Sequence, residues 1–155
     1  MAFSARILGR PIHPLVAPFP LALFVAALLC DVAWVVKGVN TPYWTLAYYC
    51  IAAGIAGGLL ASIPGFIDYL SITRPVVRRL GLRHLLANSA VLILFVFNFY
   101  LRRPSGLAAA GGHKALLLLL SSAGVSLLAV SAFFGSGMVY LHGAGTMPDR
   151  EKTSI

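Results

Sequence analysis

The sequence predicts an all-α integral membrane protein, a four-helix bundle with both termini in the cytoplasm. Of the 155 residues, 59% are hydrophobic and only 10% are charged, which is far too little polar surface for a water-soluble domain. The chain contains four long apolar runs, each near or above the roughly 20 residues that cross the hydrocarbon core. The basic residues gather at the ends of these runs, where they meet anionic headgroups. The net charge of +8 therefore indicates contact with a lipid bilayer and predicts no nucleic-acid partner.

The four predicted helices cover residues 14–37, 43–67, 82–101 and 115–141. They form one domain over residues 9–145, flanked by polar termini at 1–8 and 146–155. Proline at position 14 suits the first turn of a helix, because its missing N–H group would have no partner there. Pro18 and Pro20 follow closely, so we expect the first helix to bend or to start late. We expect residues 73–81 to form a basic connector between the second and third helices.

An even number of spans places both termini on one side of the membrane. Eight basic residues fall on that side, namely Arg6, Arg10, Arg74, Arg78, Arg79, Arg83, Arg150 and Lys152. Four fall on the other, namely Lys37, Arg102, Arg103 and Lys114. The positive-inside rule therefore assigns both termini to the cytoplasm.

Small residues recur on one face of two helices. Gly54, Gly58, Ala61 and Gly65 share a face of the second helix, and Gly124, Ser131 and Gly135 share a face of the fourth. Such faces allow backbones to approach closely where lipid supplies no hydrophobic drive between helices. We expect them to pack within one bundle, with an interface between copies in a homo-oligomer as the alternative.

Cys30 and Cys50 lie inside apolar runs, and the chain has no CxxC or CxxCH motif. Thioredoxin-like chemistry and covalent c-type haem attachment are thereby excluded. We expect two thiols that act as small hydrophobic side chains. The sequence alone does not establish whether they pair.

Histidines and one carboxylate are expected together at the cytoplasmic rim. His13 opens the first apolar run, His84 opens the third, His142 closes the fourth and Asp68 closes the second. Asn88 and Asn98 share a face of the third helix with His84, so both amides should point into the bundle. Ionisable side chains at membrane depth mark functional sites by default.

A second polar site is expected near the opposite rim. Asp31 lies eighteen residues beyond His13, and Arg102 and Arg103 end the third helix at that rim. We expect a structural ion pair that joins two helices, with a proton relay as the alternative. His113, in a glycine-rich loop on that side, is expected to be a solvated loop residue.

Three interpretations of the histidine cluster stay open. It can be a haem b site with two axial imidazoles, as helix bundles build from facing side chains. It can be a non-haem metal site of His13, His84 and His142, with or without Asp68, whose ligand types suit zinc, iron or copper. The histidines can also be interfacial groups that bind no cofactor. The absence of a GxSxG elbow and of a glycine-rich phosphate loop favours a protein that is not an enzyme.

The ordered motifs resemble one family of small bacterial four-helix membrane proteins, catalogued as domain of unknown function 2231. They are His13-Pro14, Pro18-Phe19-Pro20, Asp31, Ala61, Gly65, Asp68-Tyr69, His84, Asn88, Arg102, the run from Gly135 to Tyr140, and His142-Gly143. The resemblance implies the four-helix fold and a location in the bacterial cytoplasmic (inner) membrane. It also implies that the polar positions of the family fall on His13, Asp31, Asp68, His84, Asn88, Arg102 and His142. Relatives joined to Rieske-type or cytochrome c domains suggest membrane electron transfer.

These observations lead to three hypotheses, the third of which is a metal-dependent membrane enzyme or transporter with a non-haem metal at the histidine cluster. In the first, the chain is a haem b-binding electron-transfer subunit that serves a membrane redox partner. His13 and His84 are the first candidates for axial ligands, because they occupy equivalent positions if the two hairpins are parallel repeats. Asp68 or Asn88 would orient an imidazole, and Arg78, Arg79 or Arg83 would pair with the propionates. In the second hypothesis, the chain is a non-catalytic structural or assembly subunit of a membrane complex.

Overall fold

The computed structural model describes residues 6–8, 10–38, 42–102 and 113–143. Two short strands, β1 (Arg6–Ile7) and β2 (Arg10–Pro11), pair antiparallel at the start. A single helical turn, α1 (His13–Val16), leads into α2 (Pro18–Lys37). The remaining helices are α3 (Tyr43–Leu70), α4 (Pro75–Leu101) and α5 (Lys114–Tyr140). Together they make the all-α bundle that the sequence predicts.

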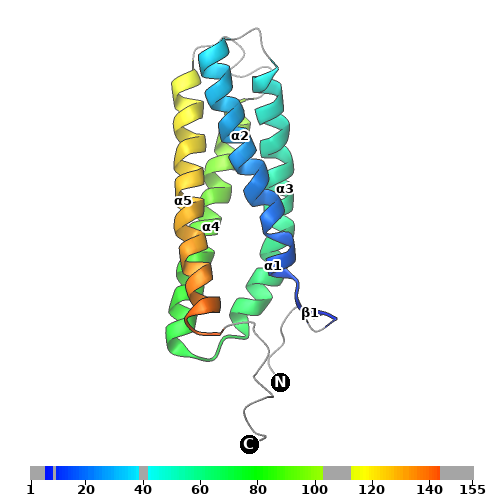
Figure 1. The fold of residues 1–155 in the computed structure, drawn as a ribbon, viewed down its shortest axis with the longest axis vertical. Helices are drawn as coiled ribbons and strands as arrows, with labels where there is room; N and C mark the ends of the chain where they lie inside the picture. Colours follow the sequence, from blue (N-terminus) through cyan, green and yellow to red (C-terminus); the bar gives the residue numbers. More distant parts are fainter. Residues whose placement is uncertain (1–5, 9, 39–41, 103–112, 144–155) are drawn as a thin grey trace, which may run out of the picture.

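Four helical segments are long and apolar enough to cross a membrane, counting α1 and α2 as one span. Only about a quarter of each span is buried inside the protein, as expected for helices whose outer faces contact lipid. The start of α1 and the end of α5 lie at the same end of the bundle (Figure 1), as an even number of spans requires. Which side of the membrane this end faces stays a prediction from the positive-inside rule.

The helix boundaries confirm one expectation and correct another. The long helix α2 begins at Pro18, after the separate turn α1, and this is the late start that the prolines predict; Ala17 between them keeps helical dihedral angles. However, α4 begins at Pro75 rather than at residue 82, so most of the expected connector is helical. Pro75 occupies the first helical turn, where proline is well tolerated, and Gly81 is buried against Tyr69, Ile72 and Met138. Tertiary packing thus overrides the helix-breaking tendency of a glycine.

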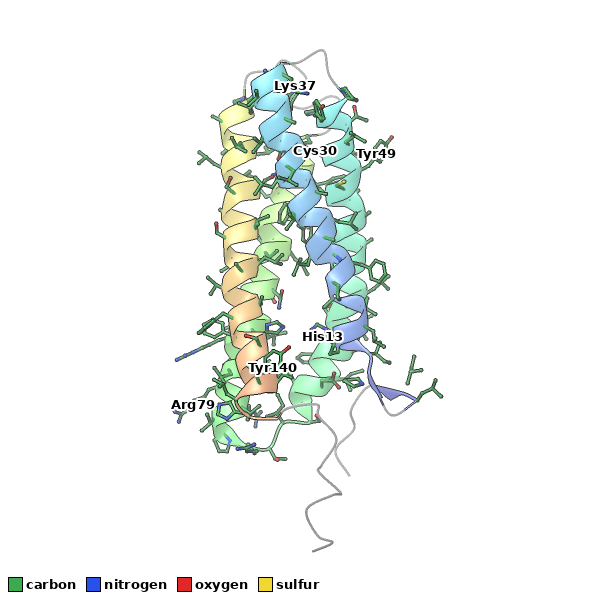
Figure 2. The ribbon with its side chains drawn as sticks, in the orientation of Figure 1. His13, Cys30, Lys37, Tyr49, Arg79 and Tyr140 are labelled. Atoms are coloured by element: carbon green, nitrogen blue, oxygen red, sulfur yellow. The ribbon has the colours of Figure 1, made fainter. Side chains whose placement is uncertain are left out.

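The bundle consists of two hairpins, α1–α3 and α4–α5. Helix α2 packs against α3 and α5, whereas α4 packs against α5 and α3. Helices α2 and α4 therefore lie diagonally across the bundle and run in the same direction. The hairpins are closest at the end that carries Lys37 and diverge toward the end that carries His13 (Figures 1 and 2).

The two hairpins repeat each other in sequence register. The offset of 71 positions between Asp31 and Arg102 also separates His13 from His84 and Phe24 from Phe95. Each of these pairs also meets in space, as stacked or T-shaped rings or as an ion pair. Equivalent residues contact one another at three levels only if the hairpins are related by an approximate two-fold axis along the bundle. We call these contacts the three axial pairs.

The middle axial pair forms the hydrophobic core. The rings of Phe24 and Phe95 stack with centroids 3.9 Å apart, and Ile51 and Val91 are buried beside them. Gly54 leaves room for the ring of Phe24, and Gly124 leaves room for the ring of Phe95. The two glycines are separated in the sequence by one position fewer than the residues of an axial pair. A Cβ atom at Gly54 would lie 2.7 Å from Phe24, and one at Gly124 would lie 2.6 Å from Phe95. The small-residue faces predicted from the sequence therefore pack inside the bundle.

Gly124→Ala should destabilise the protein, because the new methyl group would collide with a ring that is stacked on its partner and cannot move aside. Overpacking of this kind costs about 1–3 kcal/mol. Gly137→Ala on the same helix is the matched control, since a Cβ there has no neighbour within 4 Å and alanine favours helix by about 1 kcal/mol. Thermal unfolding in detergent tests this, and equal melting temperatures for the two variants would contradict it.

Candidate functional site

A fully buried ion pair joins the two hairpins at the end that carries Lys37. Arg102 Nη2 donates to both carboxylate oxygens of Asp31 at 2.6 Å, and neither side chain has exposed surface. The structure confirms the expected pair between the first and third spans. A charge at membrane depth is tolerated only with such a partner.

Two neutral side chains complete this polar network. Asn98 Oδ1 accepts from Arg102 Nε at 2.7 Å, and Ser121 Oγ donates to Asp31 Oδ2 at 2.6 Å. Asn98 Nδ2 donates to Ser121 Oγ at 2.8 Å, so the four side chains form one connected set. Arg102 Nη1 has no hydrogen-bond partner in the part of the chain that the structure describes.

His13 is held at the opposite end of the bundle. It is the first residue of α1, and its Nδ1 lies 2.8 Å from the backbone carbonyl oxygen of Ala61 on α3. A carbonyl oxygen can only accept, so Nδ1 donates this hydrogen bond and Nε2 is the ring nitrogen left for another partner. Gly65 makes room for the ring, because a Cβ there would lie 2.8 Å from Nδ1.

His84 is held in the same way in the second hairpin. Its Nδ1 lies 2.8 Å from the carbonyl oxygen of Ser131 on α5, and Gly135 makes room for the ring. Ala61 and Ser131 have the same offset in the sequence as Gly65 and Gly135. In each hairpin, therefore, the imidazole, the backbone carbonyl that accepts from its Nδ1 and the glycine beside the ring occupy equivalent positions.

Additional polar contacts surround His84. Asn88 Nδ2 lies 3.0 Å from Nε2 and also donates to the His84 carbonyl oxygen at 3.0 Å. Ser131 Oγ lies 3.0 Å from Nδ1 and 3.3 Å from the same carbonyl oxygen. The sequence-predicted Asn88 thus contacts the imidazole directly.

The two imidazoles face each other across the bundle axis. Their ring centroids are 6.0 Å apart and the ring planes are nearly perpendicular, at 84°. Both rings are partly buried. If the two hairpins are parallel repeats, His13 and His84 are equivalent residues, and this axial pair has the arrangement expected of them.

The structure brings together two of the four groups expected at this rim. His142 follows the end of α5, and its backbone carbonyl accepts from Arg74 Nη1 at 3.0 Å. Asp68 lies in the last turn of α3, where its carbonyl accepts from Ser71 Oγ at 2.7 Å. Among the described residues, no group of three or more histidine, cysteine, aspartate or glutamate side chains is placed to hold a metal ion. A metal site that includes His142 or Asp68 stays a prediction.

The structure also shows where the remaining histidine and the two cysteines lie. His113 immediately precedes α5, at the end of the bundle remote from the imidazole pair. Cys30 and Cys50 are free, half-buried thiols. Arg103, the other basic residue expected near Asp31, lies outside the described residues, as do the termini at 1–5 and 144–155.

Asn98 points into the bundle, as its face of the third predicted helix indicates, whereas the two serine hydroxyls of these networks are not predicted from the sequence. Asn98 bridges Arg102 and Ser121, and Ser131 contacts His84. Serines in an apolar helix are ordinarily packing residues, so neither Ser121 nor Ser131 stands out. The sequence repeat could have identified both serines. Ser121 and Ser131 are separated from Ile51 and Ala61 by the same number of positions as the paired glycines, and Ile51 and Ala61 are buried in α3.

Breaking the ion pair from one side should be strongly destabilising. Asp31→Ala and Arg102→Ala each leave one buried charge without a partner, at a cost of about 3–5 kcal/mol. Because the two positions are equivalent in the repeat, the exchange D31R/R102D should restore part of the stability that D31R and R102D lose singly. A double-mutant cycle of detergent melting curves measures this coupling, and strictly additive losses would contradict it.

Comparison with known proteins assigns the chain to a family but gives no solved or curated precedent. No curated protein and no solved structure matches the chain. The model of one family, described as "Predicted membrane protein (DUF2231)", matches residues 9–148, which include both hairpins, the imidazole pair and the buried ion pair. The chain therefore belongs to the DUF2231 family of predicted membrane proteins.

Proposed function

We propose that this membrane protein is a b-type cytochrome in which His13 and His84 are the two axial ligands of one haem. The observation that carries the proposal is the axial imidazole pair. One ring comes from each hairpin, and each is fixed through Nδ1 by a backbone carbonyl on the neighbouring helix.

The fixed tautomers support metal ligation. A histidine that binds a metal usually donates its other ring N–H to a carbonyl or carboxylate, which orients the ring and raises its basicity. Both imidazoles have this arrangement. The Nε2 of His84 also lies 3.0 Å from Asn88 Nδ2, so Asn88 would have to release that nitrogen before it could bind a metal ion. Asn88 keeps the His84 carbonyl oxygen as a partner when Nε2 binds iron.

The spacing of the rings also fits. Two imidazoles that would hold one metal ion through nitrogen–metal bonds of about 2.0 Å each need their centroids roughly 6 Å apart. The centroids of His13 and His84 are 6.0 Å apart. A site with two protein ligands in line suits haem, whose macrocycle supplies the other ligands, better than zinc, which takes three or four from the protein.

The surroundings match the charge of such a cofactor. The hairpins diverge toward this end of the bundle (Figure 1), where several arginines gather. Arg78 and Arg83 lie at the same end, over the rings of Tyr69 and Phe134. With Arg79, which Figure 2 shows near the end of the bundle, they supply cationic groups for the two propionates.

Bound haem would supply one-electron redox chemistry, and the protein residues would hold the iron, exclude water and set its potential. We therefore infer an electron-transfer subunit of the bacterial cytoplasmic membrane that serves a membrane redox partner. The rim position of the pair suits exchange with a protein at the membrane surface.

The test is the visible spectrum of the protein purified from cells with adequate haem supply. We expect a Soret band and, after reduction, the sharp α band of a low-spin b-type cytochrome. His113→Ala, which changes a histidine at the opposite end, should leave the spectrum unchanged, whereas H13A/H84A should remove it.

Purified, folded protein without a Soret band would contradict this function. It would favour the alternative of a structural or assembly subunit, in which the imidazoles only join helices through the carbonyls of Ala61 and Ser131. Co-purification with a stoichiometric partner that survives H13A/H84A would then identify that role.

A further inference from the structure

Two buried hydrogen-bond donors are unpaired at the end of the bundle that carries Lys37. Arg102 Nη1 and Trp44 Nε1 are both buried, and neither has a hydrogen-bond partner among the residues that the structure describes. Native proteins pair almost all such groups, so each exception calls for an explanation such as a bound ion or ligand. Both groups can only donate, and what they need is therefore a hydrogen-bond acceptor.

The unpaired nitrogen of Arg102 is the one corner of its guanidinium that the polar network does not use. The group is planar and holds its three nitrogens in a fixed fork. Nε donates to Asn98, and Nη2 donates to Asp31. Nη1 occupies the remaining corner, so its N–H bonds are directed at a position that neither Asn98 nor Asp31 fills.

Trp44 belongs to the layer of side chains next to that network. It packs against a buried hydrophobic cluster formed by Trp34 and Leu117. Leu101, which directly precedes Arg102 in the chain, packs against the same cluster. The carbonyl oxygen of Leu117 accepts a hydrogen bond from the polar network at 3.2 Å. The indole and the guanidinium therefore lie at the same level of the bundle, and each hairpin contributes one of them.

The charge at this end favours an anion over a neutral acceptor. In the part of the chain that the structure describes, the basic side chains here are Lys37, Arg102 and Lys114, and the only acidic one is Asp31. Lys114 Nζ lies 5.1 Å from the centroid of the Trp34 ring, so this cation lies over the hydrophobic cluster. Since Asp31 neutralises Arg102, the two lysines leave a net positive charge that attracts anions.

We propose that this end of the bundle contains a binding site for a small monovalent anion of the halide class, with Arg102 Nη1 and Trp44 Nε1 as its donors. The ion pair with Asp31 orients the guanidinium, and Lys37 and Lys114 raise the local concentration of anions. A small ion is favoured because both donor atoms are buried, which excludes the bulky substituents of a lipid phosphate. The site lies at the opposite end from the imidazole pair and does not depend on the proposed haem.

The probe is iodide, added to the purified full-length protein in a neutral detergent while gluconate keeps the ionic strength constant. Iodide quenches the fluorescence of an indole on contact. The two tryptophans of the chain, Trp34 and Trp44, both belong to this layer, so their emission reports the site directly. We expect a quenching component that saturates with iodide concentration and that chloride reverses, in addition to linear collisional quenching.

A second measurement is independent of the fluorescent side chains. A ligand that binds only the folded protein raises its melting temperature, so chloride in place of gluconate should stabilise the wild type. Trp44→Phe keeps an aromatic ring and removes the N–H, which should weaken halide binding roughly tenfold or more. Arg102→Lys keeps a positive charge opposite Asp31 without the forked donor and should abolish the effect of chloride. Arg79→Lys, at an exposed position of the opposite end, is the matched control and should retain it.

Each outcome decides for or against the site. Collisional quenching alone, or equal melting temperatures in chloride and gluconate, would overturn the proposal. Saturable binding that W44F and R102K leave unchanged would place the anion elsewhere and would overturn it too. So would displacement of iodide by dispersed phosphatidylglycerol but not by chloride, because the occupant would then be a lipid headgroup. If R102K does not fold, W44F decides. H13A/H84A should bind halide as the wild type does, so this inference and the proposed function are tested separately.

Discussion

A charge buried in a hydrocarbon environment must be neutralised, and this requirement determines how the two hairpins meet. Asp31 belongs to one hairpin and Arg102 to the other, and neither has exposed surface. Only a pairing of the first hairpin with the second satisfies both, because either hairpin paired with a copy of itself would place like charges together. The ion pair thus fixes both the partner and the register of the assembly.

The rest of the axis follows from that register. Once Asp31 meets Arg102, the equivalence of the hairpins places Phe24 against Phe95 and His13 against His84. The glycines at 54, 65, 124 and 135 leave room for these aromatic and imidazole rings. The imidazole pair lies eighteen residues from the ion pair along both α4 and the first span, or about 27 Å at 1.5 Å per residue. A structural charge at one end therefore positions a candidate cofactor site at the other.

Much of this arrangement is predictable from the chain. Hydropathy located four spans, because lipid contact leaves long apolar runs that need no periodic pattern. The prolines predicted the late start of α2, and the charges of Asp31 and Arg102 at one depth predicted their pairing. The start of α4 was not predictable, since Arg78, Arg79 and Gly81 resemble a connector until their packing is seen. The convergence of His142 and Asp68 with the other histidines rests on depth alone and stays a prediction. The backbone carbonyls of Ala61 and Ser131 carry no sequence signal at all, yet they fix the tautomers on which the proposed chemistry depends.

The near-perpendicular planes of the two imidazoles, at 84°, give the central claim its most direct measurement. Low-temperature electron paramagnetic resonance of the oxidised, purified protein reports both the axial ligands and their relative orientation. Ligation by His13 and His84 in this geometry predicts a low-spin ferric signal of the strongly anisotropic type that perpendicular imidazole planes produce. A high-spin signal, a low-spin signal of the parallel-plane type or a protein without ferric haem would contradict it.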